Sequence, residues 1–366
     1  MSFLKNLRKF IRRKKHFNLQ FFRHTSILKQ VKKNTSTRNT KISKNYLSRL
    51  TKEYLLREKK YNYNKNSSDI WDPIFRNEQK NLHASLQDKD KKNVEYILDY
   101  PGNSNLLIGF ENNVSSKMWK NDIENMYALD KLLSFAEFLG IGNIYNPEQD
   151  KISVYKIDIE NLIKKIEKKV GIRLNFKNVF PGEGGILTSR GILSEKEIQA
   201  LYAAYKISKI IKKNDKVLEV GAGLGRTAYY CNLFGVKDYT IVDIPITFLA
   251  QGNYLARVLS EKKIIFENEF SSKNKKNKIK LITPEYFLKD DSKYSLVLNC
   301  DSLTEVNYDL AIDYMKKISK SKYFLSINHE KNSFNISALI KKFKYKSYSR
   351  NLYWLRKGYI EEFVEF

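Results

Sequence analysis

The sequence predicts an α/β fold built on a mostly parallel sheet, and three observations support this prediction. Short apolar runs bounded by turn residues recur from residue 216 onward, which is typical of buried parallel strands. Amphipathic segments of helical period separate these runs, as the crossover connections of a parallel sheet require. A glycine-rich turn joins the first strand to a helix, at Glu219-Val220-Gly221-Ala222-Gly223-Leu224-Gly225. The pattern is that of a Rossmann-like sheet.

The glycines at positions 221, 223 and 225 predict a ligand-binding turn. Residues without side chains let the backbone turn tightly and approach a ligand closely. The helix that begins at Arg226 directs its free N–H groups and its positive dipole end toward this turn. A second strand ends in Asp243, about 20 residues later, the spacing of a carboxylate that binds ribose hydroxyls. Together these features predict a nucleoside-binding βαβ unit rather than a glycine-rich connection that binds nothing.

Glu219 and the third glycine distinguish between nucleoside cofactors. A dinucleotide site has the pattern Gly-x-Gly-x-x-Gly, and here the third glycine comes one position early, at Gly225. S-adenosylmethionine (SAM) has no pyrophosphate, but its amino-acid end carries an ammonium and a sulfonium, which suit a carboxylate and glycine carbonyls. The sequence therefore predicts SAM rather than NAD. The expected contacts come from Glu219, Gly221, Ala222, Gly223, Gly225, Arg226, Asp243, Ile244 and Asn299.

Helical and strand periods predict the other elements. A helix over 126–139 ends at Gly140, and another spans 158–170. Residues 180–191 form a glycine-rich loop, which the following helix places near the site entrance. Ser194 is expected to cap that helix, in a capping box with Glu197. Further expectations are helices over 226–234, 247–259 and 308–318, strands over 239–242, 279–282 and 323–327, and a C-terminal antiparallel hairpin of 345–354 with 359–366.

Polar residues follow two neighbouring strands where each strand ends. The strand that starts near residue 294 leads to Asp301 and Glu305, and the next ends near His329. Ligands of open parallel sheets bind beyond the carboxyl ends of strands, so these side chains are expected in the cleft. The His329 imidazole can accept a hydroxyl proton, with Asp301 orienting the ring or acting as the base itself. The alternative is a structural His329 that only hydrogen-bonds a loop carbonyl. Two carboxylates at the spacing of Asp301 and Glu305 favour a helix start over a Mg²⁺ site, so no metal is predicted.

Composition and charge divide the chain into three regions. Residues 1–60 hold 19 Lys/Arg against two acids, and so carry 17 of the 27 excess positive charges. Residues 1–66 are expected to form a basic tail, partly disordered or amphipathic. The apolar spacing of 3–11 indicates a basic amphipathic helix that binds a membrane surface or an acidic partner. A mobile solvated tail is an equal alternative, and nucleic-acid binding is the third. Residues 67–190 are expected as a mostly helical lid or substrate region, and 191–366 as the Rossmann-like catalytic domain.

The chain resembles the sugar O-methyltransferase family, bacterial enzymes associated with cell-surface glycan biosynthesis. The likeness covers about residues 150–335. The motifs that carry it are Thr188–Ser194, Ala200–Tyr205, Glu219–Tyr229, Val242–Pro245, Asn299–Glu305 and Ser326–Glu330.

The resemblance implies transfer of a methyl group from SAM to a sugar hydroxyl of a glycan precursor. Its acceptor would be a sugar, a nucleotide-sugar or a lipid-linked glycan, with catalysis by His329, Asp301 and Glu305. Arg190, Tyr202 and Ser302, which lie in or beside these motifs, are expected to bind the acceptor.

Two other functions remain as alternatives. A methyltransferase of nucleic acid or of another small molecule is one, although the sequence lacks an Asn-Pro-Pro-Tyr-like stretch for amino methylation. An NAD-dependent oxidoreductase is the other, opposed by the glycine spacing and Glu219. No apolar run reaches the length of a membrane span, so a cytoplasmic location is expected, with the inner face of the membrane as a second expectation.

Overall fold

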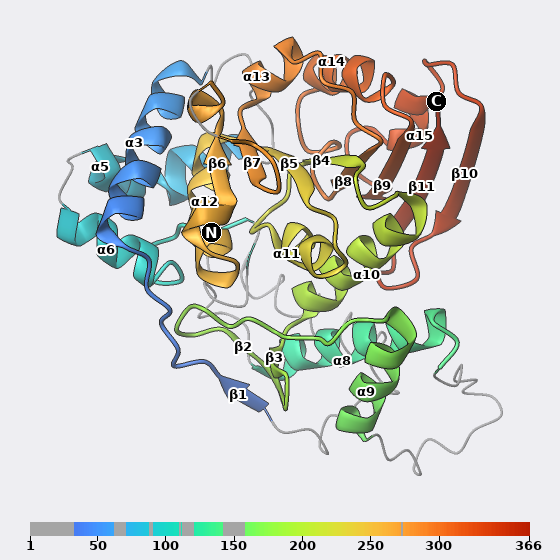
Figure 1. The fold of residues 1–366 in the computed structure, drawn as a ribbon, viewed down its shortest axis with the longest axis horizontal. Coiled ribbons are helices and arrows are strands. Elements are labelled where there is room, and N and C mark those ends of the chain that lie inside the picture. The colour runs from blue at the N-terminus through green and yellow to red at the C-terminus, as the bar shows by residue number, and fades with distance from the viewer. Residues whose placement is uncertain are drawn as a thin grey trace, which may run out of the picture.

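The computed structural model describes residues 33–61, 71–87, 91–109, 111, 121–141, 158–271 and 274–366. Figure 1 shows a central sheet with helices on both faces and a second, smaller sheet beside it. The amphipathic helix expected within residues 3–11 lies outside the described residues, as does most of the basic excess of the N-terminal end.

The central sheet has eight strands in the order β10-β11-β9-β8-β4-β5-β7-β6. Across the sheet, the neighbouring strands β9, β8, β4, β5, β7 and β6 pair in parallel. Strand β11 runs antiparallel to both of its neighbours, β10 and β9. The predicted α/β fold with an antiparallel C-terminal hairpin is confirmed. The strands are β4 (Lys216–Val220), β5 (Asp238–Val242), β6 (Ile264–Phe266), β7 (Ile279–Ile282), β8 (Leu296–Cys300), β9 (Tyr323–His329), β10 (Ser347–Leu352) and β11 (Tyr359–Glu365).

The two faces of the sheet carry separate cores. Along β4, Val217 packs into one core with α10, α11 and α12, and the next residue, Leu218, packs into the other with α13, α14 and α15. Strands covered on both faces read as continuous apolar runs, which explains why the sequence shows them clearly. The helices are α10 (Glu195–Ile210), α11 (Arg226–Leu233), α12 (Pro245–Val258), α13 (Pro284–Lys289), α14 (Tyr308–Ile318) and α15 (Ile336–Ile340), with short 3₁₀ turns at Glu261–Lys263 and Glu267–Glu269.

The region before the central sheet is mostly helical in its described parts, as expected. Its small antiparallel sheet joins β1 (Lys33–Thr35), β2 (Gly184–Thr188) and β3 (Gly191–Leu193), so part of the glycine-rich loop expected over 180–191 is a hairpin. The helices are α3 (Lys44–Lys60), α4 (Trp71–Pro73), the π-helical turn Ile74–Glu78, α5 (Lys80–Gln87), α6 (Lys91–Asp99), α8 (Asn121–Phe138) and α9 (Ile159–Val170). Among the described helices, none has the length and apolar character that crossing a bilayer demands.

Helix α3 belongs to the fold rather than to a tail. The Tyr46 hydroxyl donates to the Gly252 carbonyl of α12 at 3.0 Å, and Leu50 is fully buried against the same helix. A methyl group at Gly252 would come within 2.4 Å of the Leu50 side chain, so the glycine allows the two helices to approach closely. The boundary expected at residue 66 is therefore corrected, because residues 33–61 pack on the sheet region.

The start of α10 differs from the expected capping box. Ser194 occupies the N-cap position, but its side chain accepts no hydrogen bond from the helix. Glu197, which a capping box would turn back toward Ser194, instead bonds to Arg226 and Tyr230 of α11. Glu197 pairs with the buried Arg226 instead of capping the helix, because hydrogen bonds between charged groups are stronger than those between neutral groups.

We expect Leu50→Ala to lower the free energy of unfolding by about 2–5 kcal/mol, because it opens a cavity between α3 and α12. Leu56→Ala is the matched control, since Leu56 lies on the same helix with its side chain partly in solvent. Urea denaturation of the full chain measures both. Equal, small effects would show that α3 does not stabilise the fold.

Candidate active site

The glycine turn after β4 requires glycine for steric reasons. Gly221, Gly223 and Gly225 have φ angles of +72°, +54° and +88°, which L side chains rarely adopt. At Gly221 an added Cβ would also lie 2.1 Å from the Ser302 hydroxyl oxygen. Gly225 then caps α11, and its N–H donates to the Ala222 carbonyl at 2.9 Å. The turn therefore places exposed backbone at the carboxyl edge of the sheet, as the sequence predicted.

A cavity of about 320 Å³ opens at this edge, where β4, β5 and β8 end. It brings together residues from the glycine turn and from the strand ends on either side, and also residues from the N-terminal region. The predicted residues that line it are Glu219, Gly221, Ala222, Gly223, Arg226, Asp243, Ile244, Asp301, Ser302 and Glu305.

Asp243 holds the glycine turn as well as facing the cavity. Its carboxylate accepts the Ala222 N–H at 3.0 Å and the Gln251 side-chain amide at 2.6 Å. The same Gln251 nitrogen donates to the Gly223 carbonyl at 3.0 Å, so it fastens the acid to the turn. Burial raises the pKa of Asp243 to about 7. Gln251 was missed from the sequence, where its only signal is a glutamine within an otherwise apolar stretch of helix.

Glu219 is almost completely buried at the end of β4 and reaches the same cavity. The Tyr239 hydroxyl of β5 donates to it at 2.8 Å. Burial raises the pKa of Glu219 to about 7, although the hydrogen bond from Tyr239 opposes that rise. An acid in this state prefers either a proton or a cation from a ligand.

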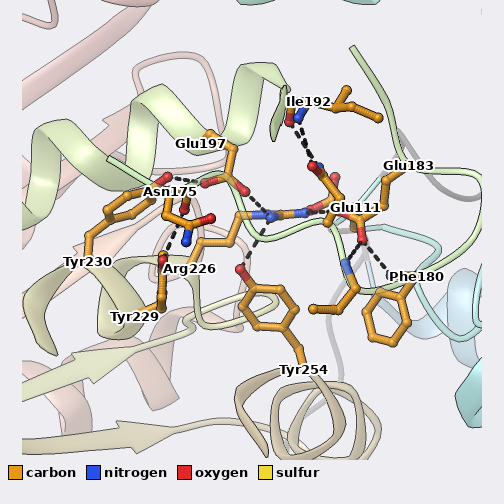
Figure 2. A network of polar contacts seen from close by, with 12 residues as sticks. Glu111, Asn175, Phe180, Glu183, Ile192, Glu197, Arg226, Tyr229, Tyr230 and Tyr254 are labelled. Atoms are coloured by element: carbon orange, nitrogen blue, oxygen red, sulfur yellow. Dashed lines mark hydrogen bonds and ion pairs between the residues drawn. The ribbon is translucent and has the colours of Figure 1, made fainter. Parts of the chain in front are cut away.

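Arg226 connects the glycine turn to three separate segments (Figure 2). Its guanidinium pairs with Glu197 of α10, with Glu111 at 3.1 Å and with Glu183 at 3.4 Å. Glu183 also accepts the N–H groups of residues 179 and 180, each at 2.8 Å. Burial raises the pKa of Glu183 to about 7 and also raises that of Glu197. Arg226 lines the cavity, but its charge is committed to this carboxylate cluster.

The part of the cavity beyond the end of β8 is built around Asp301 and Glu305. Asp301 pairs with Arg356 at 2.5 Å, and Arg356 stacks 3.9 Å from the centre of the Tyr359 ring. Glu305 accepts the indole N–H of Trp71 at 3.1 Å. Burial, together with the charge of Asp301, raises the pKa of Glu305 to about 7. Trp71 and Arg356 had no local sequence signal, because both reach the site from distant segments.

Five predicted site residues are not among the described residues that line the cavity. Gly225 is one of them, since it caps α11 at the end of the glycine turn. The Asn299 amide lies behind the cavity, donating to the Val220 carbonyl at 2.8 Å and accepting from Asn328 at 2.7 Å. The Tyr202 hydroxyl donates to Glu361 at 2.5 Å within the core. These two residues support the site from behind rather than contact a ligand.

Arg190 and His329 also lie apart from the cavity. Arg190 forms a two-pronged pair with Glu167 of α9, at 2.7 and 2.9 Å, which fastens the β2–β3 hairpin. His329 Nδ1 accepts the Lys331 N–H at 3.0 Å, and its ring meets Tyr359 edge-on. The structure therefore places Arg190 away from the expected acceptor site. It gives His329 a contact with a loop N–H, where the alternative to catalysis had been a loop carbonyl.

Similarity to known proteins is found among solved structures. No family model matches the sequence, and no curated protein matches it. Solved structures do: a candidate RNA methyltransferase from Pyrococcus horikoshii has 16% identity and a TM-score of 0.31, over 55% of this chain and 97% of that chain. Magnesium protoporphyrin IX methyltransferase from Synechocystis PCC 6803 with bound SAH has 12% identity and a TM-score of 0.32, over 46% of this chain and 81% of that chain. An O-methyltransferase family protein from Burkholderia thailandensis has 8% identity and a TM-score of 0.35, over 47% of this chain and 57% of that chain.

Identities and TM-scores this low say nothing of the function, which is therefore argued from the chain's own residues. The fold is decided by the chain's own sheet: a parallel sheet with the glycine turn after β4 and an antiparallel β11 is the Rossmann-like sheet expected from the sequence.

We expect Glu183→Gln to flatten the pH dependence of stability. The pKa of Glu183 rises from 4.5 to about 7 on folding, so the folded state binds the proton more tightly and stability falls as pH rises between these values. The glutamine keeps an acceptor for the two N–H groups. At about 1.4 kcal/mol per pKa unit, up to roughly 3 kcal/mol of the decline should disappear.

Urea denaturation at pH 5 and pH 8 measures this difference. Glu167→Gln is the control: its hydrogen bond with Arg190 lowers the pKa of Glu167, so its effect should be the same at both pH values. An unchanged pH dependence in Glu183→Gln would show that Glu183 is not the proton-binding group.

Proposed function

We propose that the chain is a SAM-dependent O-methyltransferase whose acceptor is a sugar hydroxyl of a glycan precursor. One observation carries the proposal. A single cavity joins the glycine turn and Asp243 with Glu305, a carboxylate whose pKa of about 7 suits a general base. The first part suits a nucleoside cofactor, and the second suits removal of a hydroxyl proton.

The residues around the turn fit SAM. Gly221, Ala222 and Gly223 line the cavity with at most a methyl side chain, so a ligand can approach the backbone there. Glu219 would hold the amino-acid end, and Asp243 the ribose hydroxyls. When bound, SAM supplies an electrophilic methyl group on a sulfonium. Three carboxylates with raised pKa values, Glu219, Asp243 and Glu305, line the cavity and favour a cationic ligand over a pyrophosphate.

Glu305 is our choice for the general base. With a pKa of about 7, its carboxylate is partly ionised at neutral pH and accepts a proton readily. The Trp71 indole orients the carboxylate through its N–H. Asp301 is already paired with Arg356 and is better placed to fix the acceptor. His329, engaged with the Lys331 N–H, becomes the second choice.

Aromatic rings of the cavity suit a sugar acceptor. Trp71, Tyr353 and Tyr359 line it, and the C–H faces of a pyranose pack well on aromatic faces. Lys196 and Arg356 line the same space and can donate to sugar hydroxyls or to a phosphate of an activated sugar. We propose a nucleotide-sugar or lipid-linked sugar, methylated in the cytoplasm or at the inner face of the membrane.

The acceptor class is tested with tritiated SAM. The protein is incubated with a panel of nucleotide-sugars, with a glycolipid extract and with total RNA. Transfer of label to a sugar fraction supports the proposal. Transfer to RNA alone, or to none of them by a protein that binds SAM, would overturn the sugar acceptor.

We expect Asp243→Asn to weaken SAM binding by about 1.5–3 kcal/mol, the value of one charged hydrogen bond. Asp238→Asn is the control, because Asp238 begins the same strand and pairs with Lys280 at the opposite edge of the sheet. Isothermal titration calorimetry measures both dissociation constants. Equal affinities in the two variants would remove Asp243 from the cofactor site.

For Glu305→Gln we expect turnover to fall by roughly 10²–10⁴-fold, the usual contribution of a general base, with SAM affinity retained. In the unsubstituted protein the rate should rise with pH and level off above about 7, since only ionised Glu305 accepts the proton. The labelled-methyl assay across pH measures this. Loss of turnover in His329→Gln, but not in Glu305→Gln, would reverse the assignment.

A further inference from the structure

One face of helix α10 forms a wall of the cavity. Its cavity-lining residues recur three and four positions apart, which places them on the same side of the helix: Lys196, Gln199, Ala200 and Ala203. Ala200 and Ala203 are buried and small, so they leave room beside the helix instead of filling it. Lys196 and Gln199 are longer, polar and only partly buried. The wall therefore presents an ammonium and an amide to the space of the cavity.

Neither of these two polar side chains is committed to another part of the protein. In the part of the chain that the structure describes, the Lys196 ammonium forms no ion pair or hydrogen bond, and the Gln199 amide forms no hydrogen bond. The other two cations that line the cavity are paired, Arg226 with its carboxylate cluster and Arg356 with Asp301. Among the described lining residues, Lys196 is thus the cation that remains available to a ligand.

The acids near Lys196 leave its charge available. Glu195 pairs with the buried Lys131 at 2.5 Å. Burial and the charge of Asp301 raise the pKa of Glu305, and the charge of Lys196 opposes that rise. Lys196 and Glu305 are therefore close enough to interact through their charges, and both line the cavity without forming an ion pair. A bound molecule can reach the ammonium and the candidate base at the same time.

An anionic group on a sugar matches this wall. An ammonium binds a phosphate or a carboxylate best, because hydrogen bonds between charged groups are about twice as strong as those between neutral groups. An amide beside it both donates to and accepts from sugar hydroxyls. The rings of Trp71 and Tyr359 line the same cavity and offer apolar faces to a pyranose. The activated sugars named above as acceptors carry a phosphate on the anomeric carbon.

We propose that Lys196 and Gln199 form a subsite that selects an anionic sugar. The Lys196 ammonium pairs with a phosphate or carboxylate of the sugar, and the Gln199 amide binds a ring hydroxyl. That this sugar is the methyl acceptor rests on the proposed function, but the preference for an anion is a property of binding and is measured without methyl transfer.

The experiment is isothermal titration calorimetry on the full chain with excess S-adenosylhomocysteine, which has no methyl group to transfer. The probes are matched forms of glucose, galactose and mannose: the 1-phosphate, the uronate and the uncharged methyl glycoside. We expect an anionic form to bind more tightly than the methyl glycoside of the same sugar, by roughly tenfold or more. Tighter binding of the 1-phosphate identifies the anion as phosphate, and tighter binding of the uronate identifies it as carboxylate.

Variants of the same helix separate charge from shape. Lys196→Met should abolish the preference for the anion and leave the affinity for the methyl glycoside unchanged, whereas Lys196→Arg should retain the preference. Gln199→Ala should weaken charged and uncharged probes alike. Lys209→Met is the matched control, because Lys209 is exposed in the last turn of α10 and is not among the lining residues. It should bind every probe as the unsubstituted protein does, and all four variants should keep their melting temperature.

Three results would overturn the subsite: equal binding of anionic and uncharged probes, no binding of any anionic probe, or a preference that survives Lys196→Met. The proposed function fails separately. An anion preference that depends on Lys196, in a protein that transfers no label from tritiated SAM to any acceptor, would leave the subsite standing and remove the methyl transfer. Transfer of label to an uncharged sugar at the same rate in Lys196→Met would support the methyl transfer and remove the subsite.

Discussion

The pairing of Arg226 with Glu111, Glu183 and Glu197 is the interaction on which the site depends. Arg226 is the first residue of the helix that follows the glycine turn, so wherever its guanidinium is held, the turn is held too. The carboxylates come from the N-terminal region, from the segment before β2 and from α10 (Figure 2). Breaking a buried pair commonly costs about 3–5 kcal/mol, because it leaves a charge without compensation. The position of the turn is therefore set by buried charge as much as by glycine geometry.

The acids that face the cavity are all buried, but different hydrogen-bond donors orient them. Burial raises the pKa of Glu219, Asp243 and Glu305 to about 7 in each case. Glu219 and Asp243 are oriented by donors behind the cavity wall, Tyr239 and Gln251. Glu305 has its donor, Trp71, from the opposite region of the chain. In the function that we propose, the first two accept hydrogen bonds from polar groups of the cofactor, and the third exchanges a proton.

The features that depend only on residues close together in the chain were predicted from the sequence. The apolar runs, the glycine turn and Asp243 were readable, and helix α14 (Tyr308–Ile318) has the bounds its period indicates, because a helix needs only its own face and caps. Strand β6 was missed because three apolar residues carry no period. Arg190 and Tyr202 were misplaced because their partners, Glu167 and Glu361, lie 23 and 159 residues away. For the same reason Trp71 and Arg356 were not found. Gln251 was missed although Asp243 lies only 8 residues away, because a helix period does not show which polar side chain turns back to the strand end.

The separation of a lid region from a catalytic domain at residue 190 does not describe how the cavity is built. Tyr61, Trp71 and Glu111 line it from the N-terminal region, alongside residues of the strand ends. Glu305 has its indole donor from that region, and two of the three carboxylates that pair with Arg226, Glu111 and Glu183, lie before residue 191. A chain starting at residue 191 would retain the cofactor turn but leave Arg226 without Glu111 and Glu183. The N-terminal region is therefore part of the site, and its presence explains why acids inside the cavity are buried enough to hold protons near neutral pH.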